Sequence, residues 1–597
     1  MRTLRTNPMN ARQIVEEVFT KPLSDLIWTA NTLIVLPLTP QNFAVGSVLP
    51  AAFYMCRRGC RRGKGRFQYA FSPSEKMPAT IYCVSGKLSQ SAKHFEGFDS
   101  EVQKDILGDL LLCDSLENIK HKEGHHEEIQ RAFPVHFFAS WLDLPPAVAN
   151  LRFVPEMLLC LLANQSLEQK VIPASSRKPF RVGVDPQENL LLKIFGKGVK
   201  FGNNPADLRG DSFDESARVT FEELLMIRLA QACEEAPETP RATRAGGADI
   251  QNSWPISHRA AFALREDLSK FLATYGEGIP RRSITPMLES LLGLGLLNIF
   301  LESCSIMVSW DETGKILPFA EQKAFPIFVD ASNGIDSRIR DLSEQSFDEI
   351  TRLHDQASNS LMSVRILDAK ARYNRKLKDF IPKGPDTSAW LDILGLIRSD
   401  KHETSDVILN DLFEKIEALA DRLEAEGLES EAVSVLRSPD ANRDPVRVLS
   451  DSLCLMMGDK LLRAKQLMFL DSCLMVNEPH GIGRKRRVSR SIGGRKRKSM
   501  DARSAILPNT VLETLVHLHL STHDGILSFI DFLQILRERY GLWVDESPPG
   551  VAASREDLLN NRAMLEKRLR DLGLLVGVND AEFMKHLRPR YQRNTEQ

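Results

Sequence analysis

The densest group of potential metal ligands lies at residues 121–128, which read His-Lys-Glu-Gly-His-His-Glu-Glu. His121 and His125 would share one face of a helix, because residues four apart lie one turn from each other. In zinc proteases a glutamate directly follows the first histidine and acts as the base. Here the acid comes one position later, and Gly124 weakens the helix. We expect a polar surface helix, with a metal site at His121, His125 and Glu128 as the alternative.

A second constellation follows the apolar strand expected at 325–329. Asp330 and Ser332 form an Asp-x-Ser pattern, which metal-dependent adhesion domains and some phosphatases place after a strand. Gly334 stands where the adhesion pattern needs serine. An Asx turn after the strand explains the residues more simply. We assign no catalytic residue and expect no cofactor.

A run of positive charge is the clearest functional signal in the chain. Residues 484–498 contain nine Lys or Arg and no acid. Like charges at this density repel one another, so we expect 477–506 to form a basic flexible segment. A flexible basic arm beside a groove-reading fold adds phosphate contacts. The expected contacts are Arg484, Lys485, Arg486, Arg487, Arg495, Lys496, Arg497 and Lys498.

The C-terminal region, 507–597, has the pattern of three helices followed by two short strands. Ser554 and Asp557 form a capping signal for a third helix that ends near Leu572. Three helices closed by a hairpin form the winged-helix plan, in which the third helix usually enters the major groove. Winged helices also dock proteins, and cations on a helix often form only a solvated face. The expected nucleic-acid contacts are Arg555, Arg562, Lys567, Arg568, Lys585 and Arg588.

A basic loop near the N-terminus is a further candidate for phosphate contact. Residues 57–66 contain six cations and no acid, and the loop's glycines would let backbone approach a phosphate. A cationic surface turn is the simpler alternative. The candidate contacts are Arg57, Arg58, Arg61 and Arg62.

The elements that hold these residues indicate an α+β, predominantly helical multidomain protein with a C-terminal winged-helix-like domain. Apolar residues at helical spacing predict an amphipathic helix over 407–426 and a buried helix over 287–301. Residues 80–84 and 190–195 resemble strands. The expected divisions are a mixed α/β domain at 1–150, its α/β continuation at 151–234, a linker at 235–253, a helical domain at 254–476, and the basic segment and final domain described above.

Composition excludes several classes of protein. The chain has 597 residues, with 78 Lys and Arg against 79 Asp and Glu, so it is neither a uniformly basic coat protein nor an acidic disordered chain. No run of eighteen apolar residues is present, so we expect no membrane span. Nine scattered cysteines, with only Cys56 and Cys60 close together, argue against a disulfide framework and favour a cytoplasmic location.

The long mixed body, the basic hinge and the ending LEKRLRDLGLL…PRY resemble large accessory proteins of bacterial multi-gene phage-defence and restriction systems. The stretch VLPAAFYMCRRGCRRGKGRF adds to the resemblance. It implies a non-catalytic partner that works beside a methyltransferase, nuclease or ATPase.

The leading hypothesis is therefore a DNA-binding accessory or scaffold component of a prokaryotic anti-phage defence or DNA-processing complex. Its expected partners are duplex DNA and other protein subunits, with no membrane. One alternative is a metal-dependent nuclease or hydrolase that uses the 121–128 cluster or Asp330. The other is a protein–protein scaffold whose winged helix docks partners.

Overall fold

The computed structural model confirms a predominantly helical α+β chain with small sheets. The described residues are 10–19, 23–24, 35–58, 70–72, 79–90, 95–117, 129–141, 151, 153–164, 170–172, 176–182, 189–200, 213–234, 250, 254–381, 387–438, 444–458, 463–492, 496–522, 527–577 and 585–592.

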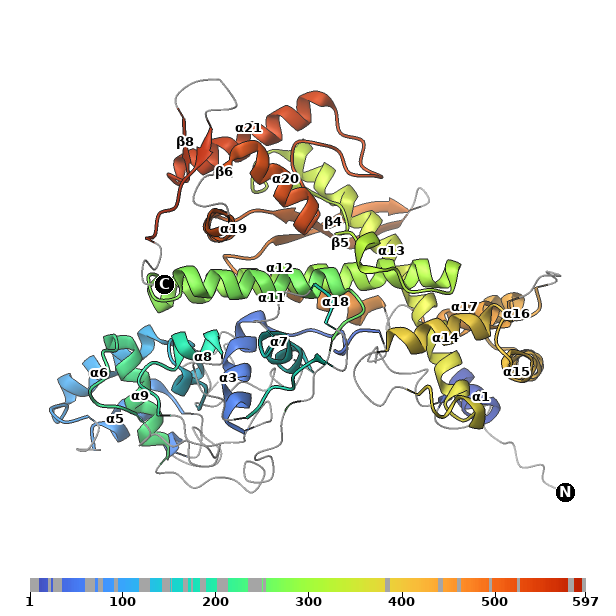
Figure 1. The fold of residues 1–597 in the computed structure, drawn as a ribbon, viewed down its shortest axis with the longest axis horizontal. Coiled ribbons are helices and arrows are strands. Elements are labelled where there is room, and N and C mark those ends of the chain that lie inside the picture. Colours follow the sequence, from blue (N-terminus) through green and yellow to red (C-terminus); the bar gives the residue numbers. More distant parts are fainter. Residues whose placement is uncertain are drawn as a thin grey trace.

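The long helix α12 (Arg281–Thr313) runs through the middle of the molecule (Figure 1). The sequence predicted only its central part, because Pro286 resembled a helix start; the structure places it inside the helix. By length and hydropathy α12 could cross a membrane, but 83% of its apolar window is buried within the fold. Helices α11 (His258–Tyr275) and α13 (Ser337–Ala371) pack along it.

The N-terminal half lies on one side of α12 (Figure 1). Residues 80–84 and 190–195, predicted as strands, instead form helical turns. Thr80 caps the first of these helices by accepting a hydrogen bond from the Cys83 amide. The elements are η1 (Val45–Ser47), α3 (Val48–Arg58), α5 (Ile81–Leu88), α6 (Glu101–Cys113), β1 (Ser115–Glu117), β2 (Ile129–Ala132), η2 (Phe137–Trp141), α7 (Val154–Leu162), α8 (Leu190–Phe195) and α9 (Phe221–Glu234).

A second core forms beside the C-terminal half of α13. The predicted amphipathic helix is α15 (Ser405–Ala425), and its apolar stripe from Ile408 to Leu423 is buried, which confirms the prediction. Also present are α1 (Ala11–Val18), η8 (Phe319–Glu321), η9 (Arg375–Leu377), α14 (Ser388–Arg398), α16 (Ser430–Leu436) and α17 (Pro445–Met457).

A mixed four-stranded sheet joins distant parts of the chain. Its order is β4-β5-β3-β7, with β3 (Ile327–Asp330) parallel to both neighbours and β4 antiparallel to β5. All four residues of β3 are buried. The other strands are β4 (Gly483–Ile492), β5 (Lys496–Ile506) and β7 (Leu542–Trp543), and α18 (Arg463–Cys473) precedes them.

The C-terminal module follows directly and packs against α11 and α12, with which it shares one apolar core. Its sheet has the order β6-β9-β8 and is antiparallel throughout. The first of these strands was not predicted. The elements are α19 (Asn509–Thr522), β6 (Leu527–Ser528), α20 (Phe529–Tyr540), α21 (Arg555–Asp571), β8 (Leu575–Val576) and β9 (His586–Leu587).

Candidate nucleic-acid interface

The basic segment forms a two-stranded ribbon where the sequence predicted a flexible arm. Ten residue pairs join β4 to β5, from Gly483 opposite Ala505 to Ile492 opposite Lys496. Backbone hydrogen bonds between the strands offset the mutual repulsion of the cations, which a charge count alone does not reveal. Figure 1 shows the ribbon leaving the body beside α13.

Carboxylates of the body neutralise the base of this ribbon. Arg486 binds Glu344 of α13 through two hydrogen bonds of 2.5 and 2.8 Å. Lys485 lies 3.0 Å from a carboxylate oxygen of Asp471 on α18, and Arg503 also pairs with Asp471. The hydrogen bond to Glu344 raises the pKa of Arg486. These cations therefore anchor the ribbon to the body.

Other cations of the ribbon are not neutralised by these carboxylates of the body. Arg484 and Arg487 are exposed and make no ion pair with another described residue. From residue 487 to residue 498 the sequence has six cations and no acid. Lys496, Arg497 and Lys498 open β5, whereas Arg495 lies outside the described residues.

The predicted third helix is α21, and the capping box of Ser554 with Asp557 is present. Arg568 of this helix points into the protein, where it donates hydrogen bonds to the carbonyls of Ala331 and Leu507 at 3.1 and 2.5 Å. Burial lowers the pKa of Arg568. This side chain joins α21 to the end of β3 and is not presented to a ligand.

The other predicted cations of the module differ in their surroundings. The Arg562 guanidinium lies 5.7 Å from the ring centre of Phe529. Lys567 is exposed beside Asp571, and Arg555 is exposed. In the return strand region, Lys585 pairs with Glu566 at 2.9 Å, and Arg588 donates to the Gly573 carbonyl at 2.8 Å.

The N-terminal candidates are only partly described. Arg57 and Arg58 end helix α3, and Arg61 and Arg62 lie outside the described residues. The 121–128 cluster, with His121, His125 and Glu128, also lies outside them. Among the residues that are described, no group of three His, Cys, Asp or Glu side chains could hold a metal ion.

The Asp330 constellation forms the turn that the sequence favoured. The Asp330 carboxylate accepts hydrogen bonds from the Ser332 amide, the Ser332 hydroxyl and the Gly334 amide at 2.5–2.8 Å. Asp336 then caps α13. Burial raises the pKa of Asp330, although these hydrogen bonds oppose the effect. The carboxylate therefore stabilises the turn between β3 and α13.

Asn561 is a buried residue of the site that no sequence pattern identified. Its amide donates to the carbonyls of Val329 and Val544 at 2.8 and 2.9 Å, and its oxygen accepts from the Ala331 amide. It holds α21 against β3. Its partners are more than 200 residues away or lie across a loop, so no local pattern could reveal them.

His517 fixes the end of the chain against α19. Its Nδ1 lies 2.6 Å from the Glu513 carbonyl, and its Nε2 accepts from the amides of Arg590 and Tyr591. The ring must therefore be neutral, with the proton on Nδ1. Burial lowers the pKa of His517 to about 4.

We expect acid to loosen this end of the module. Because the pKa is lower in the folded state than the ordinary 6.5, the contribution of His517 is complete above about pH 6.5 and is lost as the pH falls towards 4. Its size is roughly 3 kcal/mol. Hydrogen exchange of α19 between pH 7.5 and 4.5 measures it, and a His517→Gln variant should show a smaller pH dependence. An equal dependence in both proteins would contradict the assignment.

Comparison with known protein families supplies the biological setting. A family model described as methylation-associated defense system protein MAD7 matches residues 35–591. The chain belongs to the MAD7 family. It thus has a role in a methylation-associated defence system. This confirms the broad prediction of a defence-system protein that works with other proteins. No curated protein and no solved structure matches the chain.

Proposed function

We propose that this MAD7-family protein is a nucleic-acid-binding component of its defence system and that the β4–β5 ribbon grips duplex DNA. The supporting observation is the contrast along the ribbon. Body carboxylates pair with Lys485, Arg486 and Arg503 at its base, while residues 487–498 have six cations and no acid. An anchored element with unbalanced positive charge suits a polyanion.

The dimensions of such a ribbon fit a DNA groove. The major groove is about 12 Å wide and admits a two-stranded ribbon. The stretch of β4 from 487 to 492 is roughly 20 Å long at the usual rise per strand residue. Proteins that read DNA with β-ribbons use this arrangement.

The C-terminal module supports the proposal as a second contact. Its three helices and the strand order β6-β9-β8 agree with a winged-helix plan. Arg555 and Lys567 are its accessible cations because both are exposed, although Lys567 also pairs with Asp571, whereas Arg568 and Lys585 are half-buried and bind protein groups. The ribbon is therefore the principal contact and the module a supporting one. The protein serves as an accessory DNA-binding subunit.

A salt titration tests the proposal on the unmodified protein. Fluorescence anisotropy with a labelled 30-base-pair duplex should give a slope of log affinity against log salt of about −5, because the six cations of 487–498 would each neutralise one phosphate and each contributes about −0.9. A slope near zero, or no saturable binding at 50 mM salt, would contradict it.

A further inference from the structure

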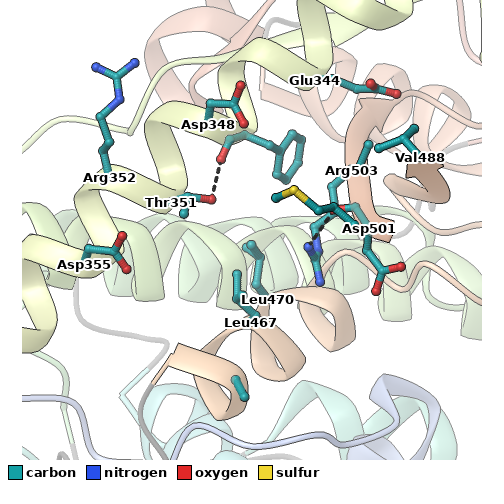
Figure 2. A pocket seen from close by; sticks show the side chains of 14 residues that line it. Glu344, Asp348, Thr351, Arg352, Asp355, Leu467, Leu470, Val488, Asp501 and Arg503 are labelled. Carbon is teal, nitrogen blue, oxygen red and sulfur yellow. Dashed lines mark hydrogen bonds between the residues drawn. The ribbon is translucent and has the colours of Figure 1, made fainter. Parts of the chain in front are cut away.

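The groove beside the base of the ribbon carries side chains of both charges. It has a volume of about 640 Å³ and is lined by α13, α18 and both strands of the ribbon. Figure 2 shows Asp348 and Arg352 on α13, and Asp501 and Arg503 on the ribbon. Acids and cations are mixed around this groove, so its charge selects no single class of ligand.

Helix α6, on the other side of α12 from the ribbon (Figure 1), presents an apolar stripe to solvent. Its residues Val102 and Ile106 are 69% and 48% exposed, and Cys113 is also exposed. At 3.6 residues per turn these three positions lie within about 40° of one another around the helix. They therefore form one stripe along the length of α6.

The opposite face of α6 is also apolar and is already buried. Leu107 and Leu111 belong to a core of the N-terminal half, and Gly108 lies against Ser85 of α5. A helix that is apolar on two faces is normally buried on both. Single exposed apolar side chains are ordinary, whereas an aligned set on such a helix indicates a surface that a partner covers.

Acids border this stripe along one edge. Asp105 and Asp109 are both exposed, and neither forms an ion pair with another residue of the described ranges. Lys104 is the one cation in the sequence of α6, and it pairs with Glu101 at 2.7 Å. This edge of the stripe therefore carries negative charge that is not balanced within the helix.

We propose that the stripe of α6 docks an amphipathic helix of a partner protein, with Lys or Arg along one edge of its apolar face. Its apolar side chains cover Val102 and Ile106 and remove them from water, while its cations meet Asp105 and Asp109. Amphipathic helices are recognised in this way, through apolar anchors at helical spacing. A second copy of α6 fits less well, because acids would meet acids. The proposal does not depend on nucleic-acid binding.

The test uses the full chain and a fluorescein-labelled helical peptide of about 18 residues. This peptide has Leu at helical spacing on one face, Lys along one edge of that face, and Ala and Gln elsewhere. In a second peptide Glu replaces Lys, and in a third the same residues are shuffled so that Leu is spread around the helix. We expect saturable binding of the first peptide and at least tenfold weaker binding of the other two. If the first peptide does not bind, or all three bind alike, the proposal is wrong.

Paired substitutions test whether the peptide occupies the apolar stripe. The double variant Val102→Ser with Ile106→Ser should bind the Lys peptide at least tenfold more weakly. The matched control is Val407→Ser with Leu455→Ser, whose side chains on α15 and α17 are 69% and 45% exposed. The control should bind as the unmodified protein does. Equal affinity of the two double variants would overturn the proposal.

Charge reversal tests the acidic edge, and sedimentation tests the competing occupant. Asp105→Lys with Asp109→Lys should weaken binding of the Lys peptide at least tenfold, whereas Glu414→Lys, an exposed acid on α15, should leave it unchanged. Without peptide, the sedimentation coefficient of Val102→Ser with Ile106→Ser should equal that of the unmodified protein. Equal affinity of the two charge variants, or an assembly of copies that this serine variant loses, would contradict docking of a partner helix.

Discussion

Replacing Arg539 by Ala should release α20 from α11 and destabilise the contact between the C-terminal module and the body by about 3 kcal/mol. The Arg539 guanidinium bonds to Asp267 at 2.5 Å and to Glu266 at 2.7 Å. The Asp267 side chain is only 6% exposed. Loss of one partner leaves a buried carboxylate without its cation, which is among the most costly changes in a protein core.

The surrounding hydrogen bonds extend this effect through the interface. The Tyr540 hydroxyl donates to the other Asp267 oxygen at 2.8 Å, and His519 lies 2.9 Å from that hydroxyl. Burial raises the pKa of Tyr540, so it remains a donor. The network therefore joins α11, α19 and α20.

Hydrogen exchange of α11 and α20 measures the loss, because local opening reports local stability. We expect exchange to accelerate about a hundredfold in Arg539→Ala. Arg537→Ala is the matched control: its partner Glu546 is exposed, so its ion pair contributes little. The double variant Asp267→Asn with Arg539→Met, which removes both charges, should be less destabilised than Arg539→Ala. Similar exchange in Arg539→Ala and the control would contradict this account.

The elements that were predicted correctly carry their signal in residues close together in the sequence. The stripe of α15, from Ile408 to Leu423, repeats at helical spacing, and Ser554 with Asp557 encodes its own cap. Both appear as predicted. The prediction of a strand at 80–84 was wrong because the four apolar residues after Thr80 fit either a strand or a helix turn, and Thr80 selects the helix by capping it.

The candidate interface depended on contacts that no local pattern contains. The sequence identified the cations of 484–498, but their strand pairing requires anchors such as Glu344, 142 residues from Arg486. Likewise, Arg568 appears in sequence as a solvated helix cation, and only the approach of β3 explains why it faces the carbonyl of Ala331. The positions of the cations could therefore be predicted from the sequence, whereas the protein groups that bind some of them could not.

Removal of cations from the far half of the ribbon should strongly reduce DNA affinity. We expect the triple variant Lys496→Ala, Arg497→Ala and Lys498→Ala to bind duplex DNA more than about a hundredfold more weakly at 0.1 M salt, because each lost phosphate contact costs roughly eightfold there. These positions lie in β5, away from the ion pairs at the base of the ribbon. The fold should therefore persist.

The matched control removes the same charge elsewhere. Arg375, Lys376 and Lys378 are exposed cations around η9. Their replacement by Ala changes the net charge equally, and we expect DNA affinity to change less than threefold. Thermal unfolding of both triple variants should match that of the unmodified protein.

The salt dependence of duplex binding by the two triple variants, measured side by side by fluorescence anisotropy, tests DNA binding through the ribbon most directly. We expect the log–log slope of the ribbon variant to be less steep by up to about 2.7, whereas the η9 variant keeps the original slope. Identical slopes in both variants would contradict the assignment of the β4–β5 ribbon as the DNA contact.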